Sequence, residues 1–129
     1  MSGRYLLDTN VSIRILNQEV AVEARRGSGL EMFLSLVVVG ELLFGAKLSD
    51  RPEMNRAKID RLRKLCPVVP QDRVTAEHYG TLKAALHRKG RPIPDNDLWI
   101  AAYALQHGLI LATRDQHFEQ VENLQIEPW

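Results

Sequence analysis

The sequence has little that would tie it to a membrane or to an oxidising compartment. It contains one cysteine, Cys66, which excludes an internal disulfide. No apolar run approaches the roughly 20 residues that a membrane-spanning helix requires. The N-terminus also lacks the basic and apolar regions of a secretory signal. These absences predict a soluble, cytoplasmic protein without a membrane partner.

An excess of charge of one sign is also missing, and aromatic side chains are few. The chain has 17 Lys and Arg residues against 16 Asp and Glu residues, so its net charge of +1 gives no global indication of nucleic-acid binding. Aromatic residues make up 6% of the chain, which argues against an extended stacking platform for single-stranded nucleic acid. Any affinity for nucleic acid must therefore come from local clusters.

What the sequence does contain is enough apolar residues for a core. Hydrophobic residues make up 45% of its 129 residues, which predicts one domain over residues 1–129. Short apolar runs alternate with helical segments, and this pattern predicts a parallel α/β sheet of four to five strands with helices on both faces. We expect strands at residues 5–7, 32–34, 68–69, 109–112 and 124–126, and helices at 11–16, 18–26, 36–47, 52–64, 74–89 and 95–106.

Four acidic residues stand where such a fold presents its ligands. Asp8 and Asp115 each follow a buried strand, and the carboxyl ends of strands border the ligand crevice of an open α/β sheet. Glu41 lies in an apolar helix, where an unpaired carboxylate costs several kcal/mol. Asp97 lies in the first turn of a helix that is apolar almost all round. We expect all four to meet in one crevice as catalytic and metal-binding residues.

Four ionised carboxylates in one crevice require a cation. Oxygen ligands select hard ions, so we expect Mg²⁺, with Mn²⁺ as a second candidate, and not zinc. The four histidines show no ligand spacing and are assigned to the surface or to helix ends. The DND triplet at residues 95–97 lacks the Gly and the distant Glu of a calcium loop. Such a metal site suits in-line displacement at a phosphodiester, which indicates a nuclease.

Three polar neighbours are candidates for supporting roles. Thr113 could hydrogen-bond a water that the metal activates, although a threonine at a strand end needs no such role. Asn10 could hold a metal-binding carboxylate in place, and helix capping explains it almost as well. Asp95 is expected to cap the helix that carries Asp97.

Positive charge is concentrated in two stretches, residues 51–64 and 83–91. A polyanionic substrate should meet such local charge, but a solvated helix face explains both stretches equally well. The candidate RNA-binding residues are Arg56, Arg63, Lys83, Arg88, Lys89 and Arg91.

Four segments together resemble the PIN-domain ribonucleases, specifically the VapC-type toxins of bacterial toxin–antitoxin pairs. These segments are LLDTN at Asp8, SLVVVGELLFGA at Glu41, IPDNDLWIAA at Asp97 and LATRD at Asp115, and the resemblance covers essentially the whole chain in order. It implies a PIN-like three-layer αβα sandwich. It also implies an endoribonuclease that depends on Mg²⁺ or Mn²⁺, with a metal-activated water attacking the RNA phosphodiester.

The family's pattern bears on individual residues and on partners. Asp8, Glu41, Asp97 and Asp115 match its acidic site, Thr113 matches a position that is often a hydroxyl, and Asp95 matches no fixed position. The resemblance implies a VapB-type antitoxin, whose C-terminal segment occupies the toxin's groove and whose N-terminal domain binds operator DNA. It also implies a homodimer.

An independent argument favours the homodimer. The apolar helix around Trp99, Ile100 and Tyr103, together with the apolar positions of residues 29–44, exceeds the needs of a five-stranded core. Surplus apolar surface is typical of interfaces.

Two alternatives stay open. A non-catalytic RNA- or partner-binding module could have kept the fold, although four retained acids argue against it. A doubly wound phosphatase or phosphotransferase could use Asp8 as its nucleophile, but such enzymes usually carry a second Asp two residues later, where this chain has Asn10. Metal-dependent cleavage of RNA would decide among these functions.

Overall fold

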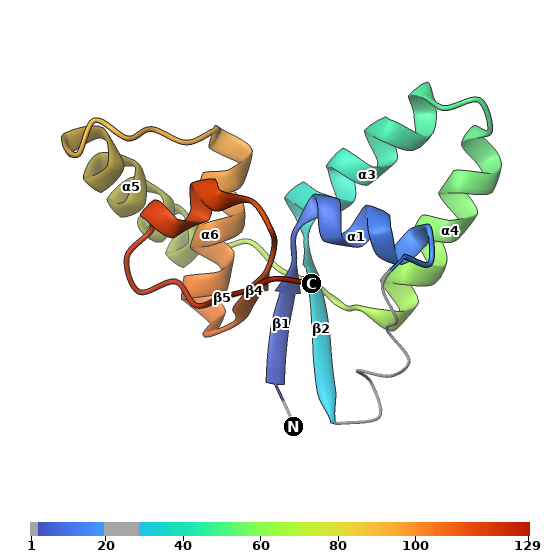
Figure 1. Cartoon of the computed structure of the whole chain (residues 1–129), viewed down its shortest axis with the longest axis horizontal. Helices are drawn as coiled ribbons and strands as arrows, with labels where there is room; N and C mark the ends of the chain where they lie inside the picture. Colours follow the sequence, from blue (N-terminus) through green and yellow to red (C-terminus); the bar gives the residue numbers. More distant parts are fainter. Residues whose placement is uncertain (1–2, 20–28) are drawn as a thin grey trace.

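A five-stranded parallel sheet lies at the centre of the protein (Figure 1). The structure is a computed structural model that describes residues 3–19 and 29–129. The strands are β1 (Gly3–Leu7), β2 (Leu30–Ser35), β3 (Val68–Val69), β4 (Ile110–Ala112) and β5 (Ile126–Glu127). They lie in the order β3-β2-β1-β4-β5, and every neighbouring pair is parallel. The predicted parallel sheet is therefore confirmed, with β3 and β5 at its edges.

Helices cover both sides of this sheet. They are α1 (Thr9–Leu16), α3 (Leu36–Leu48), α4 (Pro52–Leu65), α5 (Arg73–Arg88) and α6 (Asp95–His107), and a short 3₁₀ helix, η1, spans Gln116–Gln120. In Figure 1, α5 and α6 lie on one side of the sheet, and α1, α3 and α4 lie on the other. The predicted αβα layering is confirmed. The helix predicted at residues 18–26 falls mostly within residues 20–28, outside the described residues.

The order of the strands reverses at β1. The chain runs from β1 outward to β2 and β3, and then crosses to β4 on the other side of β1. Leu6 of β1 is in register with Phe33 of β2 and with Leu111 of β4. The carboxyl ends of β1 and β4 therefore adjoin where the connections leave in opposite directions, which is where open α/β sheets bind their ligands.

Helix α6 packs into the core, as its apolar sequence predicts. Its residues Ile100, Ala101 and Tyr103 have no exposed surface. The helix ends at Gly108, whose φ of +63° is a left-handed conformation that glycine adopts without strain, and the Leu109 N–H then donates to Ala104 O at 2.9 Å. Burial on all sides fixes the position of the first turn of α6, which carries Asp97.

The expected role of Asp95 in this turn is wrong. The N-cap of α6 is Pro94, and no side chain bonds the free N–H groups there. Asp95 Oδ1 instead accepts hydrogen bonds from Tyr79 Oη and from Lys83 Nζ, each at 3.0 Å. Two donors on α5 therefore draw the carboxylate away from the end of its own helix.

The expected source of surplus apolar surface also needs correction. Ile100 and Tyr103 are core residues, so they contribute nothing to an interface. The exposed apolar side chains of this part of the chain lie on α3, where Leu36, Phe44 and Leu48 are 55%, 66% and 72% exposed. Among the described residues, no helix is long and apolar enough to cross a membrane.

Candidate active site

Asp8 lies where β1 ends and α1 begins, and it is 5% exposed. Both of its carboxylate oxygens accept hydrogen bonds: Oδ1 from the Thr9 N–H at 2.8 Å, and Oδ2 from the Thr113 hydroxyl at 2.7 Å. Burial raises the pKa of Asp8, the two hydrogen bonds oppose that rise, and the charges of Asp115 and Glu41 add to it. The surrounding donors thus fix the direction of this carboxylate.

Thr113 and Asp115 follow β4, beside the end of β1. Thr113 is 1% exposed. Its hydroxyl donates to Asp8, at the end of β1, and accepts from the Asp115 N–H, after β4, at 3.0 Å, so it links the ends of these two strands. Asp115 Oδ1 accepts the His117 N–H at 2.9 Å and so caps η1. The Thr113 hydroxyl thus bonds a carboxylate, and its predicted support of a metal-activated water stays a prediction.

Glu41 reaches the same region from α3, the helix that follows β2. It is half-buried between the buried residues Val38 and Leu42, and its Oε1 accepts the Thr9 hydroxyl at 2.8 Å. Thr9 therefore joins Asp8, through its N–H, to Glu41, through its hydroxyl. The sequence analysis assigned no role to Thr9, although its position directly after Asp8 was the available signal.

Asp97 completes the group from the first turn of α6 and is half-buried. Its pKa is raised to about 6, first by burial and then by the negative charges of Asp8, Asp115 and Glu41, while His117 acts in the opposite direction. Thr9 joins Asp8 to Glu41, Thr113 joins Asp8 to the Asp115 N–H, and a ligand atom of Asp97 lies within 4.8 Å of one of Asp115. The four predicted acids therefore lie in one region, although they come from four different elements.

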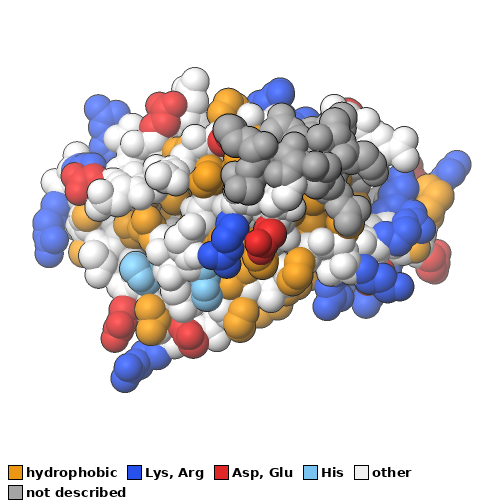
Figure 2. Space-filling view, turned by 90° about the horizontal axis from the view of Figure 1, so that it is seen from below, with side chains coloured by type: hydrophobic (Ala, Val, Ile, Leu, Met, Phe, Trp, Pro, Cys, Tyr) orange, Lys and Arg blue, Asp and Glu red, His pale blue; other side chains and the backbone are white. Residues whose placement is uncertain are grey.

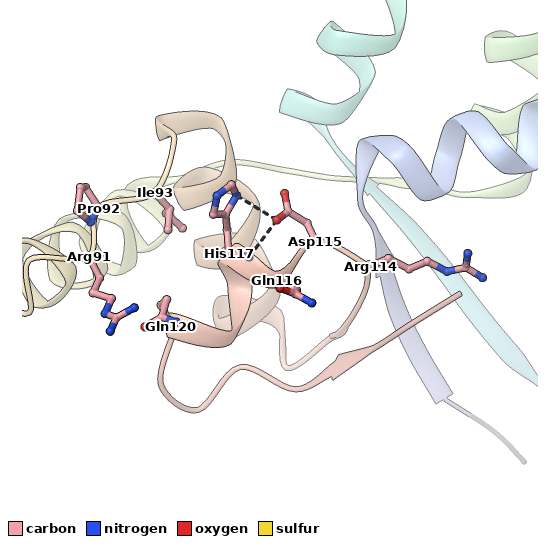
Figure 3. A pocket seen from close by; sticks show the side chains of 8 residues that line it. All are labelled: Arg91, Pro92, Ile93, Arg114, Asp115, Gln116, His117 and Gln120. Atoms are coloured by element: carbon pink, nitrogen blue, oxygen red, sulfur yellow. Dashed lines mark hydrogen bonds and ion pairs between the residues drawn. The ribbon is translucent and has the colours of Figure 1, made fainter.

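His117 is a second residue of this region, after Thr9, to which the sequence patterns gave no role. One ligand atom each of Asp97, Asp115 and His117 lies within 4.8 Å of the others, a spacing that could hold a metal ion. The His117 Nδ1 lies 3.0 Å from Asp115 Oδ1 (Figure 3). Histidine spacing gave no signal, because His117 joins the group through η1 and not through a ligand motif. Its position two residues after Asp115 was the only available indication.

Asn10, the other predicted supporting residue, is exposed in the first turn of α1. Within residues 3–19 and 29–129, its side chain forms no hydrogen bond with any of the four acids. Its neighbour Thr9 is the residue of this turn that bonds one of the four acids through its side chain, Glu41. Its proposed role of holding a carboxylate stays a prediction.

The candidate RNA-binding residues divide into two groups. Arg56 and Arg63 lie on α4 and pair with Asp60 at 3.7 and 3.9 Å. Lys and Arg side chains gather at the end of the molecule where α4 lies (Figure 2). The second group belongs to α5 and the segment after it. Lys83 pairs with Asp95 at 3.0 Å, and Lys89 pairs with Glu122 at 4.0 Å. Arg88 and Arg91, the other two members of this group, are exposed.

The donor set fits a divalent cation. It offers several carboxylate oxygens and one imidazole, and crowded carboxylates whose pKa values are raised are relieved by a positive ion. Oxygen-rich sites of this kind suit Mg²⁺ and Mn²⁺ better than zinc. Such a site, open at the carboxyl ends of two strands, is able to neutralise a phosphodiester and to position a water for attack on it.

Comparison with known proteins places this geometry in a familiar setting. Residues 5–124 match the family described as PIN domain. The chain is 35% identical to Ribonuclease VapC2 of Haemophilus influenzae over 130 residues, and 36% identical to the tRNA(fMet)-specific endonuclease VapC of Shigella flexneri over 129 residues, with 98% of each chain covered in both cases. Its structure is similar to a chain of DNA-bound VapBC from Salmonella typhimurium, with a TM-score of 0.91, 31% identity and 98% of each chain covered.

Proposed function

Because this chain belongs to the PIN domain family and to its VapC ribonucleases, we propose that it is a metal-dependent endoribonuclease and the toxin of a toxin–antitoxin pair. Residues 1–129 form its one PIN domain. The observation that carries this proposal is the grouping of four acids at the β1–β4 switch point, where burial and the charges of the other three acids raise the pKa of Asp97 to about 6. A group of acids this closely coupled has little structural purpose unless it binds a cation.

Each acid has a role that follows from its contacts. Mg²⁺, or Mn²⁺ in its place, would be held by Asp8, Glu41, Asp97 and Asp115. A divalent ion bound there would lower the pKa of its bound water and neutralise charge on the phosphodiester. Thr113 and Thr9 keep the Asp8 and Glu41 carboxylates in position. His117 orients Asp115 and adds one nitrogen donor beside it.

The substrate is RNA, and the relatives indicate which RNA to test first. The proteins of Shigella flexneri and Salmonella typhimurium are both named tRNA(fMet)-specific endonucleases, with 36% and 33% identity to this chain. Initiator tRNA is therefore the first substrate to test with this chain. An RNA substrate supports a cytoplasmic location for the activity.

A VapB-type antitoxin is the partner in this proposal. The structural neighbours from Rickettsia felis and Salmonella typhimurium are DNA-bound VapBC complexes, and the neighbour from nontypeable Haemophilus influenzae is VapBC-1. This chain meets operator DNA through the antitoxin alone, since its net charge of +1 gives it little affinity of its own.

The toxin itself forms a homodimer in this proposal. The apolar stripe of Leu36, Phe44 and Leu48 on α3 is exposed, and exposed apolar patches of this kind mark interaction surfaces. Light scattering of the isolated toxin at micromolar concentration should give twice the mass of one chain. A mass of one chain would contradict the dimer without affecting the nuclease.

The test of the proposed activity is cleavage of initiator tRNA and of unstructured RNA by the purified protein. We expect cleavage with Mg²⁺ or Mn²⁺, none with EDTA, and none from Asp97→Asn in either metal. Glu77→Gln removes one negative charge from the exposed face of α5, outside the acid group, so it serves as the matched control and should cleave normally.

Other outcomes would favour the other functions. RNA binding without metal-dependent cleavage would support a non-catalytic binding module. Hydrolysis of p-nitrophenyl phosphate without RNA cleavage would support a phosphatase. Induced expression without the antitoxin should arrest growth of the host, and Asp97→Asn should relieve the arrest.

A further inference from the structure

An open pocket of about 570 Å³ adjoins the acid group and extends beyond it. One wall is the segment between α5 and α6, which supplies Arg91 and Ile93, and the other is η1 with the turn before it, which supplies Asp115, His117 and Gln120. Asp115 and His117 therefore belong both to the pocket and to the group that could hold a metal. Anything bound in this pocket would touch the reacting centre.

Arg91 is held at the far end of the pocket from the acids. The segment turns sharply at Gly90, whose φ is +68°, and the Arg91 N–H donates to Leu86 O at 3.0 Å. The positive φ of Gly90 and this hydrogen bond form a C-terminal cap of α5 that sets the direction of the chain after the helix. In Figure 3, Arg91 lies at one end of the labelled side chains, Asp115 and His117 lie near the middle, and Arg114 lies at the opposite end.

The guanidinium of Arg91 is available to a ligand. Lys83 and Lys89, the neighbouring cations on the same side of the molecule, pair with Asp95 and Glu122. Within the described ranges 3–19 and 29–129, no acid lies within ion-pair distance of Arg91 or of Arg114, which also lines the pocket. An exposed, unpaired guanidinium beside a nuclease site is suited to a phosphate, which it binds through two parallel hydrogen bonds.

The remaining lining matches the other parts of a nucleotide. Ile93, which is 8% exposed, lines the pocket between Arg91 and the acids, and Pro92 adds an apolar side chain beside Arg91 (Figure 3). Gln116 and Gln120 bring amide groups that can donate to and accept from a base edge. The volume of about 570 Å³ lies within the roughly 300–1,000 Å³ of small-molecule sites. A free anion would use the guanidinium alone and leave the apolar and amide walls unused.

We propose that this pocket is the subsite for the nucleotide next to the scissile phosphate, with Arg91 bound to the phosphate of that nucleotide. This inference rests on the proposed ribonuclease function. The pocket then places one flanking nucleotide of the RNA, and it determines which phosphodiester lies over the acids. Because the base must enter an open pocket, the nucleotide it takes is unpaired.

The first experiment measures RNA binding in the cleavage-deficient Asp97→Asn protein with Mg²⁺. The probe is a fluorescently labelled RNA that spans the wild-type cleavage site. Arg91→Gln should weaken binding by about tenfold, as expected for loss of a charge-assisted contact. It should also reduce the slope of log affinity against log salt by about 0.7, the value for one phosphate of a single strand.

Arg73→Gln is the matched control for this measurement. Arg73 lies at the other end of α5, about 24 Å away along a helix of 16 residues, and it makes only an exposed contact with Glu77 at 3.9 Å. The control changes net charge by the same amount, so it should leave affinity and salt slope close to those of the parent. Equal effects of the two variants would show that Arg91 acts only through net charge, and would overturn the proposal.

The second experiment identifies the phosphate. Each phosphate near the cleavage site is replaced in turn by a neutral methylphosphonate, and binding is measured with and without Arg91→Gln. One methylphosphonate next to the scissile phosphate should weaken RNA binding by the protein that keeps Arg91. The same methylphosphonate should have no effect on RNA binding by the Arg91→Gln protein, since that contact is already lost. Additive effects at every position would overturn the proposal.

These outcomes separate the subsite from the proposed function. If the wild-type protein cleaves no RNA in any metal, the ribonuclease function fails first. If the wild type cleaves, Asp97→Asn does not, and Arg91→Gln binds and cleaves as the wild type does, then the function stands and only the subsite is wrong.

Discussion

Asp95 and Asp97 stand two residues apart in the first turn of α6, yet they belong to chemically opposite regions. Asp95 is exposed, and hydrogen bonds from Lys83 and Tyr79 lower the pKa of its carboxyl group. Asp97 is half-buried, and its pKa is raised to about 6 by burial and by three other acids. Residues two apart on a helix do not face each other, so one helical turn presents one acid to each region.

The comparison shows that the neighbours of an acid decide what it can do. On the outer side, α5 provides a cation and a phenol, which stabilise the ionised form of Asp95 without need of a ligand. On the inner side, the donors near Asp97 already bond Asp8 and Glu41. The negative charge of Asp97 therefore lies beside other acids, and a divalent cation bound there would offset it.

The strongest test of this difference is RNA cleavage by the two asparagine variants. Asp97→Asn removes a carboxylate that we propose binds the metal, and it should lower cleavage by more than the roughly 10–100-fold that loss of an outer hydrogen-bond partner costs. Asp95→Asn should cleave at close to the wild-type rate. Single-turnover assays in Mg²⁺ provide the measurement. Similar losses in both variants would mean that the two regions do not differ in function.

Thr113→Val tests how far the inner region depends on its support. The substitution keeps the shape of the side chain but removes the hydroxyl that donates to Asp8 and accepts from Asp115. We expect metal affinity and cleavage to fall by about 10–100-fold. Thr81→Val on the exposed surface of α5 is the control and should change neither. An unchanged metal affinity in Thr113→Val would show that Asp8 needs no such support.

Metal binding should also separate the two aspartates in thermal melts. A ligand that binds only the folded protein stabilises it by about 2.7 kcal/mol at a hundredfold excess over its dissociation constant. Mg²⁺ or Mn²⁺ should therefore raise the melting temperature of the wild type and of Asp95→Asn clearly, and that of Asp97→Asn little. If metal shifts all three proteins equally, Asp97 does not hold it.

The sequence predicted most of this architecture because its signals are local. Short apolar runs before Asp8 and Asp115 are typical of buried parallel strands, and the rule that ligands bind at their carboxyl ends brought Asp8 and Asp115 together. Glu41 was recognised because a carboxylate on an apolar helix face must find a partner or a function. These inferences need only spacing and polarity, which the chain displays directly.

What the sequence could not predict depends on contacts between distant elements. Asp95 was expected to cap α6 because capping is a local habit of aspartate, but Lys83 and Tyr79, 12 and 16 residues away, bind it instead. His117 joins the acids through the turn of η1, which no ligand spacing indicates. Thr9 lies between Asp8 and Glu41, and its hydroxyl contact becomes visible only once α1 and α3 are packed.

The smallest expected effect is on the stability of the protein without metal, where the two aspartates should act with opposite signs. The raised pKa of Asp97 means that its ionised form destabilises the folded state. This penalty is absent below the unfolded value of 3.8, grows between that pH and about 6, and is complete above it. Asp97→Asn removes the penalty, so in EDTA at pH 7.5 it should melt a few degrees above the wild type, about 1 kcal/mol after allowance for partial exposure. At pH 4 the two should melt together.

The lowered pKa of Asp95 has the reverse effect, since its ionised form stabilises the folded state above pH 3.8 and that stabilisation is lost as pH falls through the folded pKa. Asp95→Asn should therefore melt slightly below the wild type at pH 7.5 and approach it in acid. Melts of the three proteins from pH 3 to pH 8 in EDTA provide the measurement, because the approach of Asp95→Asn to the wild type falls below pH 3.8. If Asp97→Asn melts below the wild type at pH 7.5, then Asp97 is a structural residue of α6, and the contrast between the two regions is wrong.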